Sequence, residues 1–257
     1  GRPDVYIEKF LEDPRHIEVQ VFADDHGHVV HLGERECSLQ RRHQKVLEEA
    51  PAPRLGDDLR RRMGEISVLG SRHVGYSGAG TMEYLVDKSG HFYFMEMNTR
   101  IQVEHTVTEM VTGLDLVKEQ ILVAAGEELS FTQQDVVIRG HALQCRINAE
   151  DPDRDFMPPP GTISFYHAPG GPGVRVDSAA FAGCVVPPFY DSLLAKLICH
   201  GVTRETAIAR MLAALDEFLV EGVATTIPVH RRLLRDKAFR QGHLSTRFLE
   251  QYMTGGD

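Results

Sequence analysis

The sequence predicts a mixed α+β fold in which antiparallel strand pairs and helices follow one another along the chain. Apolar and polar residues alternate from Ile17 to Ala23, and the turn-forming residues 24–27 then precede a second apolar run, which is typical of a strand pair. The segment 57–69 instead carries apolar residues at helical spacing. With 257 residues, 42% of them hydrophobic, the chain can bury one large core or two modest ones.

Two strand pairs are predicted in the N-terminal half. The first spans 17–23 and 28–32, and the second spans 81–86 and 92–97. Between them lies a polar and basic stretch, 34–45, that is followed by two prolines. Because polar clusters next to proline usually mark irregular chain, this stretch is expected to be a loop.

Helices are predicted over 57–69, with Asp57 or Asp58 as the N-cap, and from Asp115 to Gly126, where acidic and glycine residues bound an apolar run. The apolar stripe of the first helix would consist of Leu59, Met63 and Ile66.

The C-terminal half is predicted to be a smaller β-rich module with few helices. A strand is expected at 138–147, and the Pro- and Gly-rich region 151–173 is typical of a boundary. One amphipathic helix would run from the Thr203 cap to Gly222. Two short helices, near 228–238 and 246–253, would complete the chain.

Composition excludes several classes of function. The 28 Lys and Arg against 37 Asp and Glu give a net charge of −9, which argues against a general nucleic-acid binder. No run of 18 apolar residues is present, so no membrane span is expected. The four cysteines are widely spaced and no leader opens the sequence, which favours free thiols and a cytoplasmic location.

The second predicted hairpin brings two carboxylates together. If Ser89-Gly90 is a two-residue turn, Glu83 and Glu96 are direct cross-strand partners with Cβ atoms roughly 5 Å apart. Two carboxylates that close repel by about 4 kcal/mol at an effective dielectric of about 20, so a proton, an arginine or a divalent cation must offset the repulsion.

The extended chain after Glu96 adds polar residues to the same face. Period-two alternation would align Glu96, Asn98, Arg100, Gln102 and Glu104. Two glutamates and an asparagine offer only oxygen ligands, which suit Mg²⁺ or Mn²⁺ beside substrate phosphates. The alternative is an ordinary solvated face of a hairpin.

The basic stretch is a second candidate site. The residues of 41–45 place four basic side chains in an acidic protein, and such a group would suit phosphate or bicarbonate. The alternative is a solvated charge run that pairs with Glu48 and Glu49. Arg146, at the end of a predicted strand, carries little information by its spacing alone.

Several long strings of residues resemble the biotin carboxylases. They are 34–45 (ERECSLQRRHQK), 48–51 (EEAP), 96–105 (EMNTRIQVEH), 139–142 (RGHA) and 146–152 (RINAEDP), and the similarity extends from about Val5 to about Leu249. The resemblance includes the biotin carboxylase component of acetyl-CoA carboxylase, with its role in fatty acid biosynthesis, and relatives that act on propionyl-CoA, methylcrotonyl-CoA or pyruvate.

The resemblance implies a fold and an activity. Residues 1–136 would be the second lobe of an ATP-grasp domain, an antiparallel sheet with helices, and 137–257 the smaller β-rich C-terminal domain. The family converts bicarbonate and ATP to carboxyphosphate and then carboxylates biotin on a carrier. The family's N-terminal domain and lid have no counterpart in the sequence given, so this chain is expected to be a C-terminal part that is inactive alone.

The resemblance also implies site residues. Glu8, Lys9, Phe10 and Leu11 would hold the adenine, with His16, Gln40 and His43 along the nucleotide. Glu83, Glu96 and Asn98 would bind Mg²⁺ or Mn²⁺ with ATP. Lys45, Arg100, Gln102 and the backbone of Val103 would hold bicarbonate, with Glu104 as the base and Arg146 beside the biotin enolate.

Partners follow from the same resemblance. A biotin carboxyl carrier protein and a carboxyltransferase are expected, together with a homodimer of the full-length protein and, in a eukaryote, a mitochondrial location. Two alternatives stay open: another ATP-grasp ligase, such as a carbamoyl-phosphate synthase half, and a non-catalytic interaction module.

Overall fold

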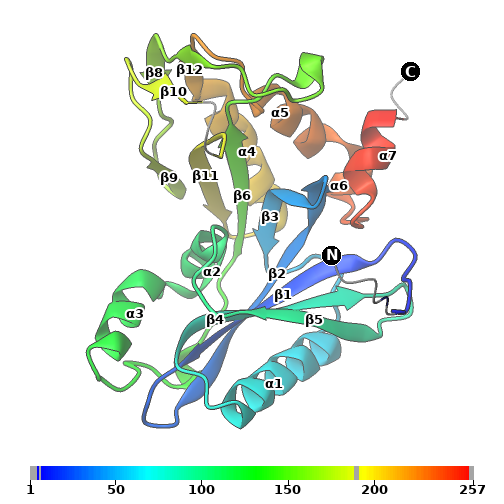
Figure 1. Cartoon of the computed structure of the whole chain (residues 1–257), viewed down its shortest axis with the longest axis vertical. Helices are drawn as coiled ribbons and strands as arrows, with labels where there is room; N and C mark the ends of the chain where they lie inside the picture. The colour runs from blue at the N-terminus through cyan, green and yellow to red at the C-terminus, as the bar shows by residue number, and fades with distance from the viewer. Residues whose placement is uncertain (1–4, 6, 188–190, 255–257) are drawn as a thin grey trace.

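The computed structural model describes residues 5, 7–187 and 191–254, and it confirms a mixed fold of helices and antiparallel strands (Figure 1). Eight strands form one sheet in the order β5-β4-β1-β2-β3-β6-β11-β9. The bounds of these strands are Arg15–Ala23 (β1), Val29–Arg41 (β2), Gln44–Ala50 (β3), Gly78–Val86 (β4), Phe92–Asn98 (β5), His141–Asn148 (β6), Val174–Ser178 (β9) and Leu193–Gly201 (β11). Two further small sheets pair β7 (Gly161–Thr162) with β10 (Val185–Val186) and β8 (Phe165–His167) with β12 (Leu219–Glu221).

The prediction of a loop over 34–45 is wrong. β2 continues to Arg41 and β3 begins at Gln44, after a turn in which Arg42 and His43 have φ of 50° and 64°. Polar residues are usually exposed to solvent, but the polar side chains of β2 are buried, and they can be buried because they form ion pairs and hydrogen bonds with one another and with neighbouring strands. Arg35, in the middle of β2, is 0% exposed.

Helix α1 (Asp57–His73) covers one face of the sheet, with corrections to its predicted cap and stripe. Gly56, rather than Asp57 or Asp58, is the N-cap. Ile66 is 44% exposed, and small residues beside Met63 face the sheet instead. A Cβ at Gly64 would lie 2.6 Å from the ring of His31, so the close approach of α1 to the sheet requires glycine there.

Helices α2 (His105–Thr112) and α3 (Leu116–Ala124) follow β5. The chain before Glu104 was expected to be extended and α2 was not predicted, because its threonines and valines are weak helix formers. The second predicted helix is confirmed as α3, and the Asp115 side chain accepts a hydrogen bond from the Lys118 backbone.

The C-terminal helices pack on the other end of the sheet (Figure 1). Thr203 caps α4 (Arg204–Glu217) as predicted, but the helix ends before Gly222 because Leu219–Glu221 forms β12. The short helices are α5 (Ile227–Arg235), α6 (Lys237–Arg240) and α7 (Phe248–Thr254). Across the described ranges, every helix is too short or too polar to cross a membrane.

The sheet forks between β3 and β6. These strands pair from Ala50↔Ala142 to Leu47↔Cys145, and beyond that point the register contains no further pair. One sheet thus contains strands from both sides of the predicted boundary between residues 136 and 137, because β3 precedes it and β6 follows it. The division into two domains at this boundary stays a prediction. The fork opens the space in which the site described next is found.

Candidate active site

The polar face of the sheet is built by strand alternation. In β1, Ile17 and Val19 pack in the core beneath α1, so Glu18 and Gln20 lie on the opposite face. Both polar side chains are buried. Because a buried charge requires partners, the neighbouring strands are expected to supply them on this face.

Three glutamates and an arginine form a cross-strand row on this face. Glu96 of β5 pairs with Glu83 of β4, as predicted. Glu83 pairs in turn with Glu18 of β1, and Glu18 with Arg35 of β2. The row therefore changes from exposed at Glu96 to fully buried at Arg35.

The register of Glu83 and Glu96 is right, but the predicted turn is wrong. The connection is not the two-residue turn Ser89-Gly90. It has three residues, 88–90, because the residues on both sides of it are hydrogen-bonded. β5 then bulges by one residue at Met95, which restores the predicted partners. Two errors in the assumed geometry cancel.

The three predicted metal ligands converge. The Asn98 amide donates to Glu83 at 3.0 Å and to Glu96 at 3.1 Å, while Arg100 donates to Asn98 Oδ1 at 3.1 Å. A solvated face fits the exposed Glu96 but not the buried Glu83. Two carboxylates and a side-chain amide therefore meet at one place, and their oxygen atoms are of the type that a hard divalent cation prefers; the Asn98 oxygen, which accepts from Arg100 here, would have to turn toward such an ion.

A second possible ligand group overlaps the first. Ligand atoms of His16, Glu18 and Glu83 lie within 4.8 Å of one another, and His16 Nε2 is 2.9 Å from Glu83 Oε2. Glu83 belongs to both groups. Burial acts to raise the pKa of Glu83, but His16 and Lys45 outweigh it and lower this pKa to about 2, so the carboxylate is available as an anion.

Lys45 lies among three buried glutamates and contacts each of them. Its ammonium contacts Glu18, and it lies 3.2 Å from Glu83 and 2.6 Å from Glu104. Burial alone would lower the pKa of Lys45, but the surrounding carboxylates raise it, so the side chain stays charged. The predicted anion-binding lysine and the predicted base therefore form an ion pair.

Arg146 closes the other side of Glu104. Its guanidinium donates to Glu48 at 2.6 Å and to Glu104 at 3.0 Å. Burial raises the pKa of Glu48 although Arg146 opposes it. Glu104 is thus held between Lys45 and Arg146, which come from the two strands that separate at the fork.

A cavity of about 280 Å³ fills the fork. Its lining joins the predicted bicarbonate and biotin residues to the turn between β2 and β3 and to α5: Arg41, His43, Gln44, Lys45, Val46, Arg100, Gln102, Val103, Glu104, Arg146, Asn148, Glu150, Phe156, Asp191, Leu193, Thr226 and Val229. Lys196 fixes the backbone here by donating to the carbonyl of Val103 at 3.2 Å.

The basic stretch divides between two environments. Lys45 enters the acid cluster, whereas Arg41 and Arg42 pair with Asp155 at 3.0 and 2.8 Å. Arg41 also lies over the ring of Phe156 at 4.0 Å. The alternative interpretation required these arginines to pair with Glu48 and Glu49, and neither of them does.

The residues predicted along the nucleotide lie at two places. His16 and Gln40 contact each other at 2.6 Å beside Glu83, whereas His43 is exposed at the rim of the cavity. The segment from Glu8 to Leu11 is outside any strand or helix. Its Lys9 donates to the Tyr93 hydroxyl at 2.7 Å on β5, and Phe10 is 84% exposed. Their role at a nucleotide stays a prediction.

Sequence reasoning did not assign a role to four buried polar residues of this site: Glu18, Gln20, Arg35 and Glu48. The sequence of β1 contained one signal for buried polar residues: Glu18 and Gln20 alternate with apolar residues in a strand whose two faces are both buried. The charged residues of β2 and β3 carried no such signal, because their strands were expected to be a loop.

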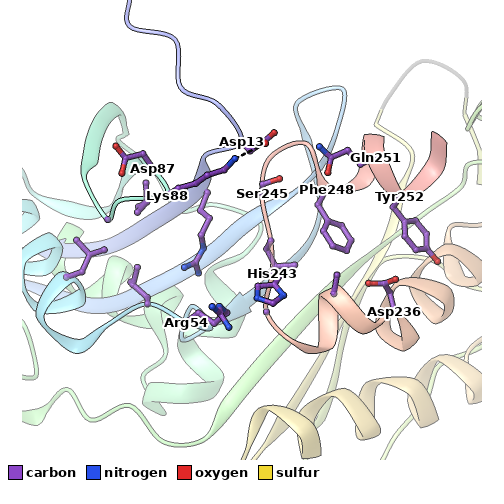
Figure 2. A pocket seen from close by; sticks show the side chains of 18 residues that line it. Asp13, Arg54, Asp87, Lys88, Asp236, His243, Ser245, Phe248, Gln251 and Tyr252 are labelled. Carbon is purple, nitrogen blue, oxygen red and sulfur yellow. Dashed lines mark hydrogen bonds and ion pairs between the residues drawn. The ribbon is translucent and has the colours of Figure 1, made fainter. Parts of the chain in front are cut away.

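A larger cavity, of about 710 Å³, lies away from this cluster (Figure 2). It is bounded by the turn at Asp87 and Lys88, by Arg54, and by the C-terminal segment that carries His243 and Phe248. None of the predicted site residues lines it. Size alone is a weaker guide to chemistry than the convergence of charged groups.

Family models match most of the chain. The model described as "Carbamoyl-phosphate synthase L chain, ATP binding domain" matches residues 1–132, and the model of the biotin carboxylase C-terminal domain matches residues 144–251. The second match is the informative one, because it covers the strand that carries Arg146.

Curated relatives agree. The chain is 58% identical over 257 residues to a pyruvate carboxylase subunit of Methanothermobacter thermautotrophicus, covering 100% of this chain and 52% of that protein. It is 59% identical over 251 residues to a biotin carboxylase of Nostoc sp., covering 98% and 56%. The chain therefore spans about half the length of these relatives.

Solved structures that superpose closely on this chain are also described as biotin carboxylase domains or subunits. A biotin carboxylase domain dimer of Hydrogenobacter thermophilus 2-oxoglutarate carboxylase, in complex with MgADP, ADP and bicarbonate, superposes with a TM-score of 0.94 at 50% identity over 96% of this chain and 54% of that one. The biotin carboxylase subunit of a pyruvate carboxylase gives 0.93 at 50% identity, covering 96% and 55%. By family models, sequence identity and fold, this chain belongs to the biotin carboxylase family of ATP-grasp proteins.

Proposed function

We propose that this chain forms the metal-, bicarbonate- and biotin-binding part of an ATP-dependent biotin carboxylase. The observation that carries the proposal is the position of Glu104 between Lys45 and Arg146, 2.6 and 3.0 Å away, at the wall of a cavity. Bound bicarbonate would compete with Glu104 for these two cations, so the freed carboxylate could accept the substrate proton while Lys45 and Arg146 neutralise the product anion.

In the first half-reaction, a bicarbonate oxygen would attack the γ-phosphorus of ATP, the bond to the β-phosphate oxygen would break so that ADP leaves and carboxyphosphate forms, and Glu104 would take the bicarbonate proton. Lys45 and Gln102 would orient the anion, with Arg100 at the cavity wall. Glu83, Glu96 and Asn98 would hold Mg²⁺ or Mn²⁺, which screens the phosphate charge. Phosphoryl transfer depends mainly on such positioning and charge neutralisation.

In the second half-reaction, the phosphate that leaves carboxyphosphate would take the N1 proton of biotin, and N1 of the resulting enolate would form a bond to the released carboxyl carbon. The biotin enolate carries negative charge, and Arg146 is a fixed cation at the cavity wall. His16, Gln40, His43 and the segment from Glu8 to Leu11 would contact the nucleotide.

The whole protein would work with a biotin carboxyl carrier protein and a carboxyltransferase, and as a homodimer. A solved relative is described as a domain dimer, which supports the last point. Relatives named biotin carboxylase and pyruvate carboxylase match about equally. The proposal is therefore the carboxylation of biotin that they share, and a role in acetyl-CoA carboxylase and fatty acid biosynthesis, or in one compartment, remains a prediction.

A second candidate is a carbamoyl-phosphate synthase-like ligase, because the ATP-binding family model carries that description. Such an enzyme has no use for an arginine that stabilises a biotin enolate. The two candidates therefore differ in the acceptor that stimulates ATP hydrolysis: biotin for one, ammonia or glutamine for the other.

The test uses the full-length protein with ATP, Mg²⁺, radiolabelled bicarbonate and free biotin. We expect ADP release that depends on biotin, with label in carboxybiotin. Glu104→Gln should lower kcat by about 10²- to 10⁴-fold, the range for a lost general base. The exposed Glu65→Gln is the matched control and should leave kcat unchanged. Stimulation by ammonia instead of biotin would favour the second candidate, and no nucleotide turnover would favour a non-catalytic module.

A further inference from the structure

Arg35 lies behind the cavity and is fully buried, yet the proposed reaction gives it no role. Its side chain is 0% exposed and is not part of the cavity lining. A buried guanidinium is costly unless each of its donors has a partner. The identity of those partners therefore indicates what this residue does.

The guanidinium distributes its hydrogen bonds over five side chains. Nη1 donates to Gln20 at 2.6 Å and to Thr108 at 3.1 Å. The two hydrogens of Nη2 are shared among Glu18 at 3.2 Å, Thr81 at 3.1 Å and Gln102 at 3.2 Å, and Nε also donates to Glu18 at 3.4 Å. Three strands and α2 thus meet at one cation. Only Gln102, of these five, also lines the cavity.

The contact with Gln102 settles which end of its amide faces the site. Arginine has five donors and no acceptor, so the group that meets it must be the oxygen Oε1. The nitrogen Nε2 then points the other way and donates to Glu83 at 2.8 Å. Gln102, which lines the cavity, therefore presents its donor end on the side away from Arg35, toward the acidic row, and an amide nitrogen is the end that an anionic substrate requires.

Arg35 also acts on Lys45 through one carboxylate. Glu18 accepts from Arg35 with Oε2 and from Lys45 with Oε1. Two of the groups proposed to hold bicarbonate, the Gln102 amide and the Lys45 ammonium, are thus held from behind by the same guanidinium. Among the described contacts, neither Glu96 nor Arg146 shares a hydrogen-bonding partner with Arg35.

We propose that Arg35 is a positioning residue for bicarbonate: it fixes the polarity of the Gln102 amide and, through Glu18, the place of Lys45. The inference rests on the proposed function and deepens it. Arg35 touches no substrate, so its loss weakens bicarbonate binding rather than ATP or biotin binding.

The test measures the KM values for bicarbonate, ATP and biotin in the full-length protein. Arg35→Lys keeps the charge but cannot reach five partners. We expect the KM for bicarbonate to rise at least about tenfold, the scale of one hydrogen bond to a charged group, with the other two KM values within about twofold. Arg204→Lys is the matched control, because Arg204 is a largely buried arginine that pairs with Glu49, away from the cavity.

A double-mutant cycle separates positioning from general damage. If Arg35 acts in part through Gln102, Arg35→Lys raises the bicarbonate KM less in the Gln102→Leu background than in the wild type, and the rise that remains measures its effect through Lys45. Additive effects, or equal rises in all three KM values, would overturn the inference.

A variant that leaves Arg35 intact covers the case in which Arg35→Lys does not fold. Gln102→Glu is nearly isosteric and replaces the outward donor by an acceptor, so it should also raise the KM for bicarbonate at least about tenfold. Bicarbonate affinity equal to that of the wild type would refute the polarity argument. If the wild type shows no bicarbonate-dependent turnover, the proposed function fails instead.

Discussion

Replacement of Lys45 by methionine removes the cation at the centre of the acid cluster. The cluster comprises four buried or nearly buried acids (Glu18, Glu48, Glu83 and Glu104) and three bases (Arg35, Lys45 and Arg146), so acids outnumber bases by one. Without Lys45 the acids outnumber the bases by two. The side chain of methionine fills similar space, so the change is mainly one of charge.

The structure sets the size of the effect. At an effective dielectric of about 20, an ammonium 2.6 Å from Glu104 and 3.2 Å from Glu83 attracts each by about 5 to 6 kcal/mol before desolvation is subtracted. Breaking a buried ion pair by removing one partner costs about 3–5 kcal/mol net. We expect Lys45→Met to lower the free energy of unfolding at pH 8 by that amount.

The loss should depend on pH. In the wild type the pKa of Glu83 is lowered from 4.5 to about 2, so its contribution to stability is complete above pH ~4.5 and disappears only as the pH falls toward 2. In Lys45→Met, burial is less opposed and the pKa values of Glu18 and Glu83 rise. The folded variant then binds protons more tightly than the unfolded chain, so its deficit should shrink as the pH falls from 8 to 5.

Urea unfolding of the full-length protein at pH 8, 6.5 and 5 measures this deficit. Lys88→Met is the matched control, because Lys88 forms one exposed ion pair with Asp13 at 3.2 Å and should contribute about 0–1 kcal/mol. A deficit below about 1 kcal/mol for Lys45→Met, or one that does not change with pH, would refute the description of Lys45 as the cation that neutralises the cluster.

Three further predictions concern other parts of the site. Glu96→Gln should raise the Mg²⁺ concentration needed for half-maximal ATP turnover at least about tenfold while changing the unfolding free energy by less than about 0.5 kcal/mol, since Glu96 is exposed; an unchanged metal requirement would exclude it as a ligand. Thr226→Val removes the hydroxyl that joins Arg146 and Asn148 at 3.0 Å each, and should raise the KM for biotin about tenfold, with recovery in Thr226→Ser. Burial lowers the pKa of His230 to about 4, so the wild type should lose about 2 kcal/mol of stability between pH 6.5 and pH 5 through this group, and urea unfolding of His230→Gln should lack that loss.

Much of the fold was accessible from local patterns. Strands β1, β4 and β5 and helices α3 and α4 have alternation or caps that short-range physics explains. The first residues of β2 were predicted as the strand 28–32, but its continuation to Arg41 and all of β3 were not accessible, because their charged residues resemble a loop until their partners are known. Arg35 is compatible with burial only when residues from β1, β4 and α2 surround it, and no single-sequence pattern contains that information.

Only part of the candidate site could be predicted from local patterns, because its other contacts join residues that are far apart in the sequence. The pairing of Glu83 with Glu96 was predicted from a hairpin because both residues are close in sequence, but the predicted turn is one residue too short, and the pairing is right only because the bulge at Met95 compensates. The pairing of Lys45 and Arg146 with Glu104 joins residues separated by 59 and 42 positions, and only the resemblance to a family indicated that they meet. Strand alternation predicts which face a side chain occupies, but it does not predict where two strands part.

That parting is the step from fold to function. Beyond Leu47↔Cys145, a continued ladder would bring β3 and β6 to a spacing of about 4.8 Å and leave no room for a substrate. The N-terminal turn of α5 takes the place of β3 here: Thr226 and His230 donate to the carbonyl of Arg146 at 3.0 and 2.8 Å, and the Thr226 backbone bonds to Asn148. The edge of β6 is thereby satisfied without a neighbouring strand, so the fork can stay open at little cost in unpaired backbone. The cavity therefore depends on α5, although α5 contributes no charged group to the proposed reaction.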